Sequence, residues 1–431
     1  MTYLLDTPWA TAELGLAFQH VDSSCGYTVP ELVRPGLRRN PRRAHLLVST
    51  VLGKHIPTEP AVVRGAGRRL GELVAGLLGD ASSDAVVLGF AETATGLGHC
   101  VAEALAAACY LHSTRRRVPG AEVLTGFEEG HSHATFHLLQ PTSGALFANP
   151  APLVLVDDEI STGATALDAI RALHRDRPRG RYVLASLVDM RSEQDRLRTE
   201  EVAAELGATI EHVSLASGYS VVPDDLVARV ASLPEPALNP EGDRRGDVRF
   251  VRAPWPSHVP DGGRHGMLRT DAEGFDTALA TLADTITDVR DAQRPAVVIG
   301  HEELMYLPLR LADALTERGT PTRFQTTTRS PAYVMDVDGY PLRRGFRFTA
   351  PEHIDTEFEN EVPRYLYNAQ WPTPTEIRPE LILVIDSPAD TDRLHAPGGV
   401  LDVLTAAGED VLVAVVPATD PTVLRTHREI S

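Results

Sequence analysis

The stretch that most constrains this chain is LVLVDDEISTGATALDAIRAL, residues 153–173. Four apolar residues run into three acids, and a Ser/Thr/Gly cluster then leads into a helical pattern. A continuous apolar run is typical of a strand that is buried on both faces of a parallel sheet. Because ligands gather beyond the carboxyl ends of such strands, the acids and the cluster predict a binding site there.

The residue types in this stretch suit a ribose-5-phosphate. Two adjacent carboxylates accept hydrogen bonds from vicinal hydroxyls, and the N–H groups at the start of a helix hold a phosphate. A glycine at the turn lets the backbone approach closely, while neighbouring hydroxyls add donors. The predicted binding residues are Asp157, Asp158, Glu159, Ser161, Thr162, Gly163, Ala164 and Thr165. The alternative is a solvated acidic turn followed by an ordinary helix cap.

The rest of the chain predicts two α/β domains. Short apolar runs alternate with helical periodicity from Asp84 onward, and residues 1–60 are expected to be irregular. A segment rich in proline, glycine and charge, SLPEPALNPEGDRRGD (232–247), marks a linker. We therefore expect a first domain over residues 20–235, a linker over 236–250 and a smaller Rossmann-like domain over 251–431.

The two predicted domains share a pattern. VVIGHEELMYLPLRLADAL parallels VVLGFAETATGLGHCVAEAL, and ELILVIDSPADT parallels PLVLVDDEISTGAT without the STGAT loop. One interpretation is that the second half is a degenerate copy of the first. The other is that all α/β units resemble one another.

Composition excludes some classes of function. The net charge of −18 argues against binding to a phosphate backbone, so no nucleic-acid partner is expected. No apolar stretch is long enough to span a bilayer, and there is no signal region, so we expect no membrane association. The three cysteines have no metal-ligand or redox spacing, which fits a cytoplasmic protein.

One basic residue stands out. Of the 41 lysines and arginines only Lys54 is a lysine. An ammonium is a compact point charge that a planar guanidinium does not replace, so Lys54 is a candidate functional residue. The alternative is that a single lysine survived by chance.

At residues 153–165, LVLVDDEISTGAT, the chain resembles the type I phosphoribosyltransferases. The PRPP-binding motif of that family has four apolar residues, two acids and a T-G-x-T loop. The resemblance implies a parallel-sheet phosphoribosyltransferase fold, with Mg²⁺ bound through PRPP and no firm protein ligand. GFAET (89–93) lies where the family has its pyrophosphate loop, which makes Ala91, Glu92 and Thr93 candidates for PRPP binding. STRRR (113–117) places Arg115 and Arg116 where a cation meets the leaving pyrophosphate.

The segment GFEEGHSHATFH (126–137) falls where the family has its catalytic lid. This makes Glu128, His131 and His133 candidate catalytic residues beside Lys54 and Arg115. The spacing of His131, His133 and His137 leaves a metal site open as the alternative.

A closer resemblance lies in the second half, where TTTRSP (326–331) is similar to the signature of the TRSP domain. That domain follows an orotate-phosphoribosyltransferase-like domain in bacterial proteins of tellurium-resistance-type operons. Arg329 among hydroxyls is a candidate anion site, and a buried Arg–Glu pair is the alternative. The candidate residues of this second site are Glu302, Glu303, Thr328, Arg329 and Ser330.

The resemblance implies an enzyme that transfers ribose-5-phosphate from PRPP to a base-like acceptor, releasing pyrophosphate and making a nucleotide- or nucleoside-like product. The acceptor is not identified, and a homodimer is possible. One alternative is a PRPP- or nucleotide-sensing regulator without turnover. Another is a bifunctional enzyme whose second half modifies the product.

Overall fold

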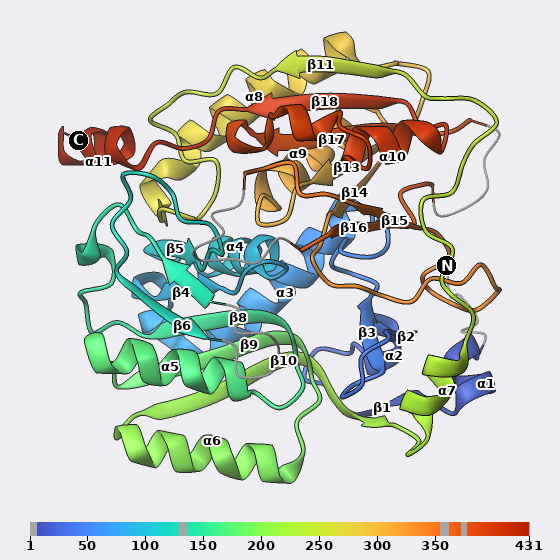
Figure 1. The fold of residues 1–431 in the computed structure, drawn as a ribbon. Helices are drawn as coiled ribbons and strands as arrows, with labels where there is room; N and C mark the ends of the chain where they lie inside the picture. The colour runs from blue at the N-terminus through green and yellow to red at the C-terminus, as the bar shows by residue number, and fades with distance from the viewer. Residues whose placement is uncertain (1–6, 129–135, 354–361, 372–376, 431) are drawn as a thin grey trace.

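The computed structural model describes residues 7–128, 136–353, 362–371 and 377–430. Two sheets of mostly parallel strands form the frame, one above the other in Figure 1. This confirms the predicted α/β class. None of the described helices combines the length and apolar character that a membrane crossing needs.

The first sheet has seven strands, with antiparallel strands at its two edges. Their order is β1 (Ala17–Asp22), β10 (Thr209–Val221), β9 (Arg181–Asp189), β8 (Leu153–Ile160), β4 (Val86–Gly89), β5 (Cys109–His112) and β12 (Met267–Leu268). Val154 and Val156 of β8 pack into one apolar core, and Leu153 and Leu155 pack into another on the opposite face. Burial on both faces explains why the first four positions of this strand, residues 153–156, are all apolar.

The second sheet has five parallel strands. Their order is β11 (Val248–Arg252), β18 (Val411–Val416), β17 (Glu380–Asp386), β13 (Ala296–Gly300) and β14 (Thr322–Thr326). Three antiparallel hairpins complete the strands: β2 (Val33–Leu37) with β3 (His45–Ser49), β6 (Thr125–Glu128) with β7 (Phe136–Leu139), and β15 (Gly345–Phe348) with β16 (Arg364–Tyr367).

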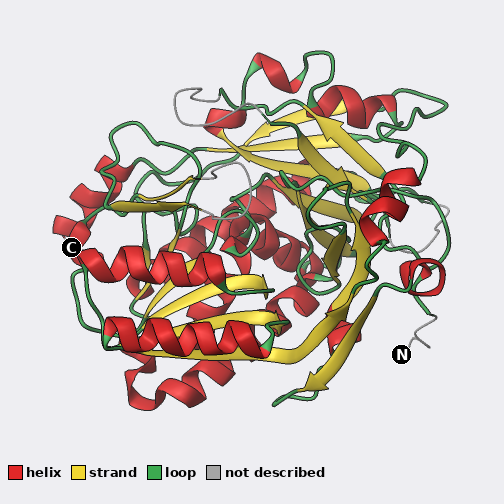
Figure 2. Ribbon diagram, turned by 60° about the horizontal axis from the view of Figure 1, so that its bottom comes forward, coloured by secondary structure: helices red, strands yellow, loops and turns green. Residues whose placement is uncertain are grey.

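Helices cover the sheets and lie between them (Figures 1 and 2). The helices are α1 (Trp9–Leu14), α2 (Val29–Leu32), α3 (Pro60–Leu78), α4 (Thr95–Leu105), α5 (Ala164–Asp176), α6 (Glu193–Leu206), α7 (Leu226–Ser232), α8 (Ala272–Val289), α9 (Tyr306–Glu317), α10 (Val400–Ala406) and α11 (Pro421–Ile430). Helices α4 and α9 contact each other between the two sheets. Residues 233–247 form no helix or strand and connect α7 to β11.

The expectation that residues 1–60 are irregular is wrong. This region contains α1, β1, α2 and the β2–β3 hairpin, and α3 begins well before Asp84. Elements of four to six residues are too short to show a period, and β1 is held by pairing with the distant strand β10.

Each sheet has a point at which the order of its strands reverses. The chain leaves β4 for β5 on one side and later returns to β8 on the other, and β13, β14 and β17 repeat this arrangement. Ligands of open α/β sheets bind at such a point, beyond the carboxyl ends of the strands. In the first sheet, this point lies between β4 and β8.

Candidate active site

Strand β8 carries the acids, and helix α5 follows it after a short loop. The strand runs through Ile160, so Asp157, Asp158 and Glu159 are its last polar positions. Gly163 caps α5 with a φ of 78°, in the left-handed region that glycine adopts without strain. The N–H groups of the first turn of α5 therefore open at the carboxyl end of β8, as the sequence predicts.

Lys54 reaches this strand end from another part of the chain. Its Nζ lies 3.4 Å from Oδ2 of Asp158 and 3.4 Å from Oγ1 of Thr93. Thr93 Oγ1 also donates to Asp158 Oδ2 at 3.2 Å. The structure thus brings together three residues that the sequence proposed from three separate segments.

Charge pairing fixes the protonation of the Lys54–Asp158 pair. Burial alone would lower the pKa of Lys54, but the carboxylates of Asp158 and Glu92 raise it above its usual value. Burial likewise opposes ionisation of Asp158, yet Lys54 and hydrogen bonds hold its pKa below the usual value. The pair is therefore an ammonium beside a carboxylate.

The pKa of Glu159 shifts in the opposite direction from that of Asp158. Burial and the neighbouring Asp158 raise its pKa to about 7, although Arg43, 3.4 Å away, acts in the opposite direction. The acidic cluster therefore changes its charge near neutral pH.

The loop that follows β4 is bound by residues far along the chain. The carboxylate of Glu92 accepts hydrogen bonds from the Thr328 hydroxyl and from the Arg329 backbone N–H, the latter at 2.9 Å. The Arg115 guanidinium lies 3.9 Å from the same carboxylate. Glu92 is only 6% exposed, so these partners replace the water that its buried carboxylate has lost.

Arg329 is engaged by carboxylates. Its guanidinium donates two hydrogen bonds to Glu302, at 3.1 and 2.7 Å, and lies 3.7 Å from Glu92. Thr328 and Arg329 thus contact the loop after β4 through Glu92, while the Arg329 guanidinium also binds Glu302 of the second domain. These contacts match the Arg–Glu pair that the sequence left as the alternative to an anion site.

A second cluster surrounds Glu302. Ligand atoms of His301, Glu302 and Glu352 lie within 4.8 Å of one another, close enough to share a metal ion. Arg364 forms ion pairs with both Glu302 and Glu352. The arginines supply the positive charge that a metal would bring, so this cluster is accounted for as an ion-pair network.

Glu303 and Asp386 extend the buried network. Glu303 accepts from the Thr114 hydroxyl and the Arg115 backbone N–H, both at 2.7 Å. Asp386 accepts two hydrogen bonds from Arg116, at 3.2 and 2.6 Å. Arg264 lies 3.3 Å from Glu303 and 3.5 Å from Asp386.

Two family models match this chain. Residues 32–219 match a family described as phosphoribosyl transferase, and residues 261–404 match the TRSP domain that lies C-terminal to it. The chain thus carries a phosphoribosyltransferase domain followed by a TRSP domain. The resemblance inferred from the sequence is confirmed.

Several solved structures are similar to part of the chain. Adenine phosphoribosyltransferase of Rhodothermus marinus is 18% identical, with a TM-score of 0.31 over 43% of this chain and 96% of that one. The Trypanosoma brucei enzyme, solved with AMP, pyrophosphate and ribose-5-phosphate, is 15% identical, with a TM-score of 0.32 over 43% and 76%. The Leishmania tarentolae enzyme is 12% identical, with a TM-score of 0.32 over 50% and 98%. A search of the curated proteins finds no match.

The predicted lid segment joins β6 and β7 of the phosphoribosyltransferase domain. Glu128 ends β6, whereas His131 and His133 lie outside the described residues. His137 is buried on β7, and its Nδ1 lies 2.9 Å from the Ser113 hydroxyl. The position of the segment between two strands agrees with the prediction, and the roles of Glu128, His131 and His133 stay predictions.

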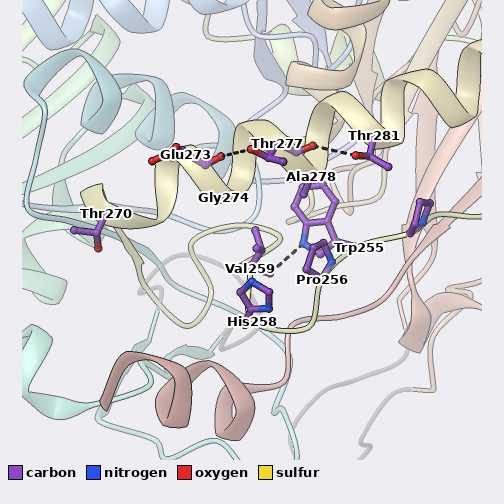
Figure 3. Close-up of a pocket in the computed structure, with 11 residues that line it drawn as sticks. Trp255, Pro256, His258, Val259, Thr270, Glu273, Gly274, Thr277, Ala278 and Thr281 are labelled. Carbon is purple, nitrogen blue, oxygen red and sulfur yellow. Dashed lines mark hydrogen bonds between the residues drawn. The ribbon is translucent and has the colours of Figure 1, made fainter. Parts of the chain in front are cut away.

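A surface cavity of about 720 Å³ lies in the TRSP domain (Figure 3). It is lined by the loop 254–259 and the first turns of α8. Trp255 donates to the Val259 carbonyl, and the hydroxyls of Thr277 and Thr281 bond back to α8 itself. No residue of the PRPP motif lines this cavity.

Sequence reasoning missed the partners that the two domains exchange. Thr114, Arg264 and Asp386 have no assigned role in the sequence analysis. Arg116 is assigned there, with Arg115, to the leaving pyrophosphate, whereas in the structure it binds Asp386. The signal that could have found them is the likeness between GKH (53–55) and GRH (263–265), which places Arg264 where the first domain has Lys54.

Proposed function

We propose that this phosphoribosyltransferase transfers ribose-5-phosphate from PRPP to a nitrogen atom of a base-like acceptor and releases pyrophosphate. The observation that carries the proposal is the convergence of Lys54, Thr93 and Asp158 beside the start of α5, at the strand reversal between β4 and β8. In this arrangement, carboxylates suited to the ribose hydroxyls and N–H groups suited to the 5′-phosphate lie next to a cation suited to the leaving pyrophosphate.

Each part of the site would have one task. The carboxylates of Asp157 and Asp158 would accept hydrogen bonds from the ribose hydroxyls. Residues 161–165 would bind the 5′-phosphate through their N–H groups and hydroxyls. Lys54 and Arg115 would face the pyrophosphate, where negative charge grows as its bond to C1 of the ribose breaks.

The carboxylate oxygens of Asp157, Asp158 and Glu159 are the ligand type that Mg²⁺ prefers, so the site fits the Mg²⁺–PRPP complex that the family implies. When bound, the ion would neutralise charge on the pyrophosphate. The described cysteines Cys25, Cys100 and Cys109 are all free thiols, which fits the proposed cytoplasmic location.

The test is release of pyrophosphate from PRPP by the full chain with Mg²⁺ and a panel of purine, pyrimidine and other nitrogen heterocycles. Acceptor-dependent release supports the proposal and identifies the acceptor class. Tight PRPP binding without release under any acceptor would instead favour the regulatory protein. Absence of PRPP binding would contradict both.

A further inference from the structure

The two domains correspond element by element. From β4 to β9 the chain runs strand, helix, strand, hairpin, strand, helix, strand, and it repeats this order from β13 to β18. The strand registers agree as well. Gly89 of β4 pairs with Val156 and His112, and Gly300 of β13 pairs with Val384 and Thr326. Asp158 and Asp386 therefore occupy equivalent positions, two residues beyond the paired valines.

The segments after β5 and β14 are bonded in the same way. Ser113 N donates to Gly89 O at 3.0 Å, and Thr327 N donates to Gly300 O at 2.9 Å. Ser113 Oγ accepts from Ala91 N at 2.9 Å, and Thr327 Oγ1 accepts from Glu302 N at 3.0 Å.

Both segments then bridge to the second strand of the following hairpin. Thr114 pairs with Leu138 of β7, and Thr328 pairs with Tyr365 of β16. Generic likeness between α/β units does not reproduce individual side-chain bonds, so the second domain is a copy of the first.

The contacts between the domains are reciprocal. Glu92 of the first domain accepts from the hydroxyl and N–H groups of Thr328 and Arg329. Its counterpart Glu303 accepts from Thr114 and Arg115. An interface to which both halves contribute the same surface patch is called isologous, and it is typical of a dimer with two-fold symmetry. The two domains therefore meet as the halves of a dimer within one chain.

The loops that contain Gly53 and Gly263 each accept a hydrogen bond from the other domain, in equivalent positions. Gly53 O accepts from Thr326 N at 2.9 Å, and Gly263 O accepts from His112 N at 3.1 Å. A Cβ on Gly53 would lie 2.6 Å from the Phe324 ring, and one on Gly263 would lie 2.4 Å from the Tyr110 ring. The loop that presents Lys54 is thus held by β14 of the other domain.

We propose that the TRSP domain is a degenerate phosphoribosyltransferase copy that has lost its own PRPP site and completes the site of the first domain. This inference rests on the proposed function. Thr326, Thr328 and Arg329 act as positioning residues, because one TRSP segment holds both the Lys54 loop and the Glu92 loop. The equivalent acid in the TRSP domain, Asp386, is closed off by Arg116 and Arg264, and no STGAT loop follows it.

The test is calorimetric binding of PRPP with Mg²⁺ to the full chain and to three variants. We expect one PRPP per chain, and about a tenfold or greater rise in Kd for Thr328→Val, because it removes a hydrogen bond to a buried charge. Thr328→Ser keeps the hydroxyl and should bind within about twofold of wild type. Thr405→Val is the matched control, since its hydroxyl bonds only within the TRSP domain, to Leu401 and Asp402.

Unchanged PRPP affinity in Thr328→Val, or two PRPP molecules per chain, would overturn the inference. If wild type binds no PRPP, the proposed function fails, and amide hydrogen exchange then decides the inference by itself. Faster exchange over residues 90–95 in Thr328→Val, but not in Thr405→Val, would support the positioning role. Equal exchange in both variants would refute it.

Discussion

The ends of β8 and β17 lie at matching places in two sheets of the same strand order, but their chemistry differs. Strand β8 has three acids near its carboxyl end, a loop whose glycine caps a helix follows it, and Lys54 reaches the second acid. Strand β17 ends in one acid, Asp386, which Arg116 and Arg264 neutralise. The same scaffold therefore carries a partly exposed acidic cluster with one lysine in the first domain and a buried arginine–carboxylate network in the other.

The cations in the two places also differ in kind. Lys54 makes long contacts, 3.4 Å to each partner, whereas Arg116 binds Asp386 through two hydrogen bonds of 3.2 and 2.6 Å. A guanidinium that matches a carboxylate in this bidentate way fixes an interface. An ammonium held by such long contacts suits the role proposed for Lys54, which is to turn toward an incoming phosphate.

The largest expected effect comes from removing the two adjacent acids at the end of β8, a pair that the end of β17 lacks. The Asp157→Asn plus Asp158→Asn variant should fold and lose at least about a thousandfold in turnover, since the ribose hydroxyls lose their acceptors. Pyrophosphate release measures this. The matched variant Asp386→Asn should instead lose stability, by about 3 kcal/mol or more, because Arg116 loses its buried partner. Near-normal turnover in a folded double variant would reject the ribose assignment.

Lys54→Arg tests whether a guanidinium can replace the ammonium at position 54. A planar fork cannot reproduce the point contact of the ammonium, and loss of one such contact in the transition state is worth roughly 2–4 kcal/mol, or about 30- to 1,000-fold in rate. We expect an unchanged melting temperature and a reduced kcat/KM for PRPP. Unaltered kcat and KM would show that the lysine is a compositional accident.

The phosphate loop gives the next effect. Gly163→Val places a branched side chain at a φ of 78° and crowds the N–H groups of α5, so PRPP affinity should fall by about a hundredfold. Calorimetry with PRPP and Mg²⁺ measures this. Gly180→Val is the control, because Gly180 has no positive φ and a Cβ there meets no atom within 4 Å. Equal affinities in the two variants would contradict the phosphate assignment.

The sequence was sufficient for local structure with strong periodicity. It predicted the strands and helices around residues 86–105 and 153–189, and the motif at 153–165 led to the confirmed family. It could not show that Thr328 and Arg329 bind Glu92, because no local pattern encodes a contact between residues more than 200 positions apart. The short elements before Pro60 were missed since their stability comes from distant partners such as β10.

The smallest expected effect concerns Glu159, whose place in the TRSP domain is taken by the uncharged Ser387. Burial and Asp158 raise the pKa of Glu159 in the folded chain to about 7, whereas in the unfolded chain it titrates near the usual carboxyl value of about 4.3. The folded state thus binds more protons between these values, so this group makes stability fall as pH rises from about 4.3 to 7. Glu159→Gln removes the titration and should raise the melting temperature at pH 8 but change it little at pH 4.5. Thermal unfolding of wild type and variant at both pH values measures the difference. An equal shift at both would show that Glu159 does not titrate in this range and that the acidic cluster keeps a constant charge.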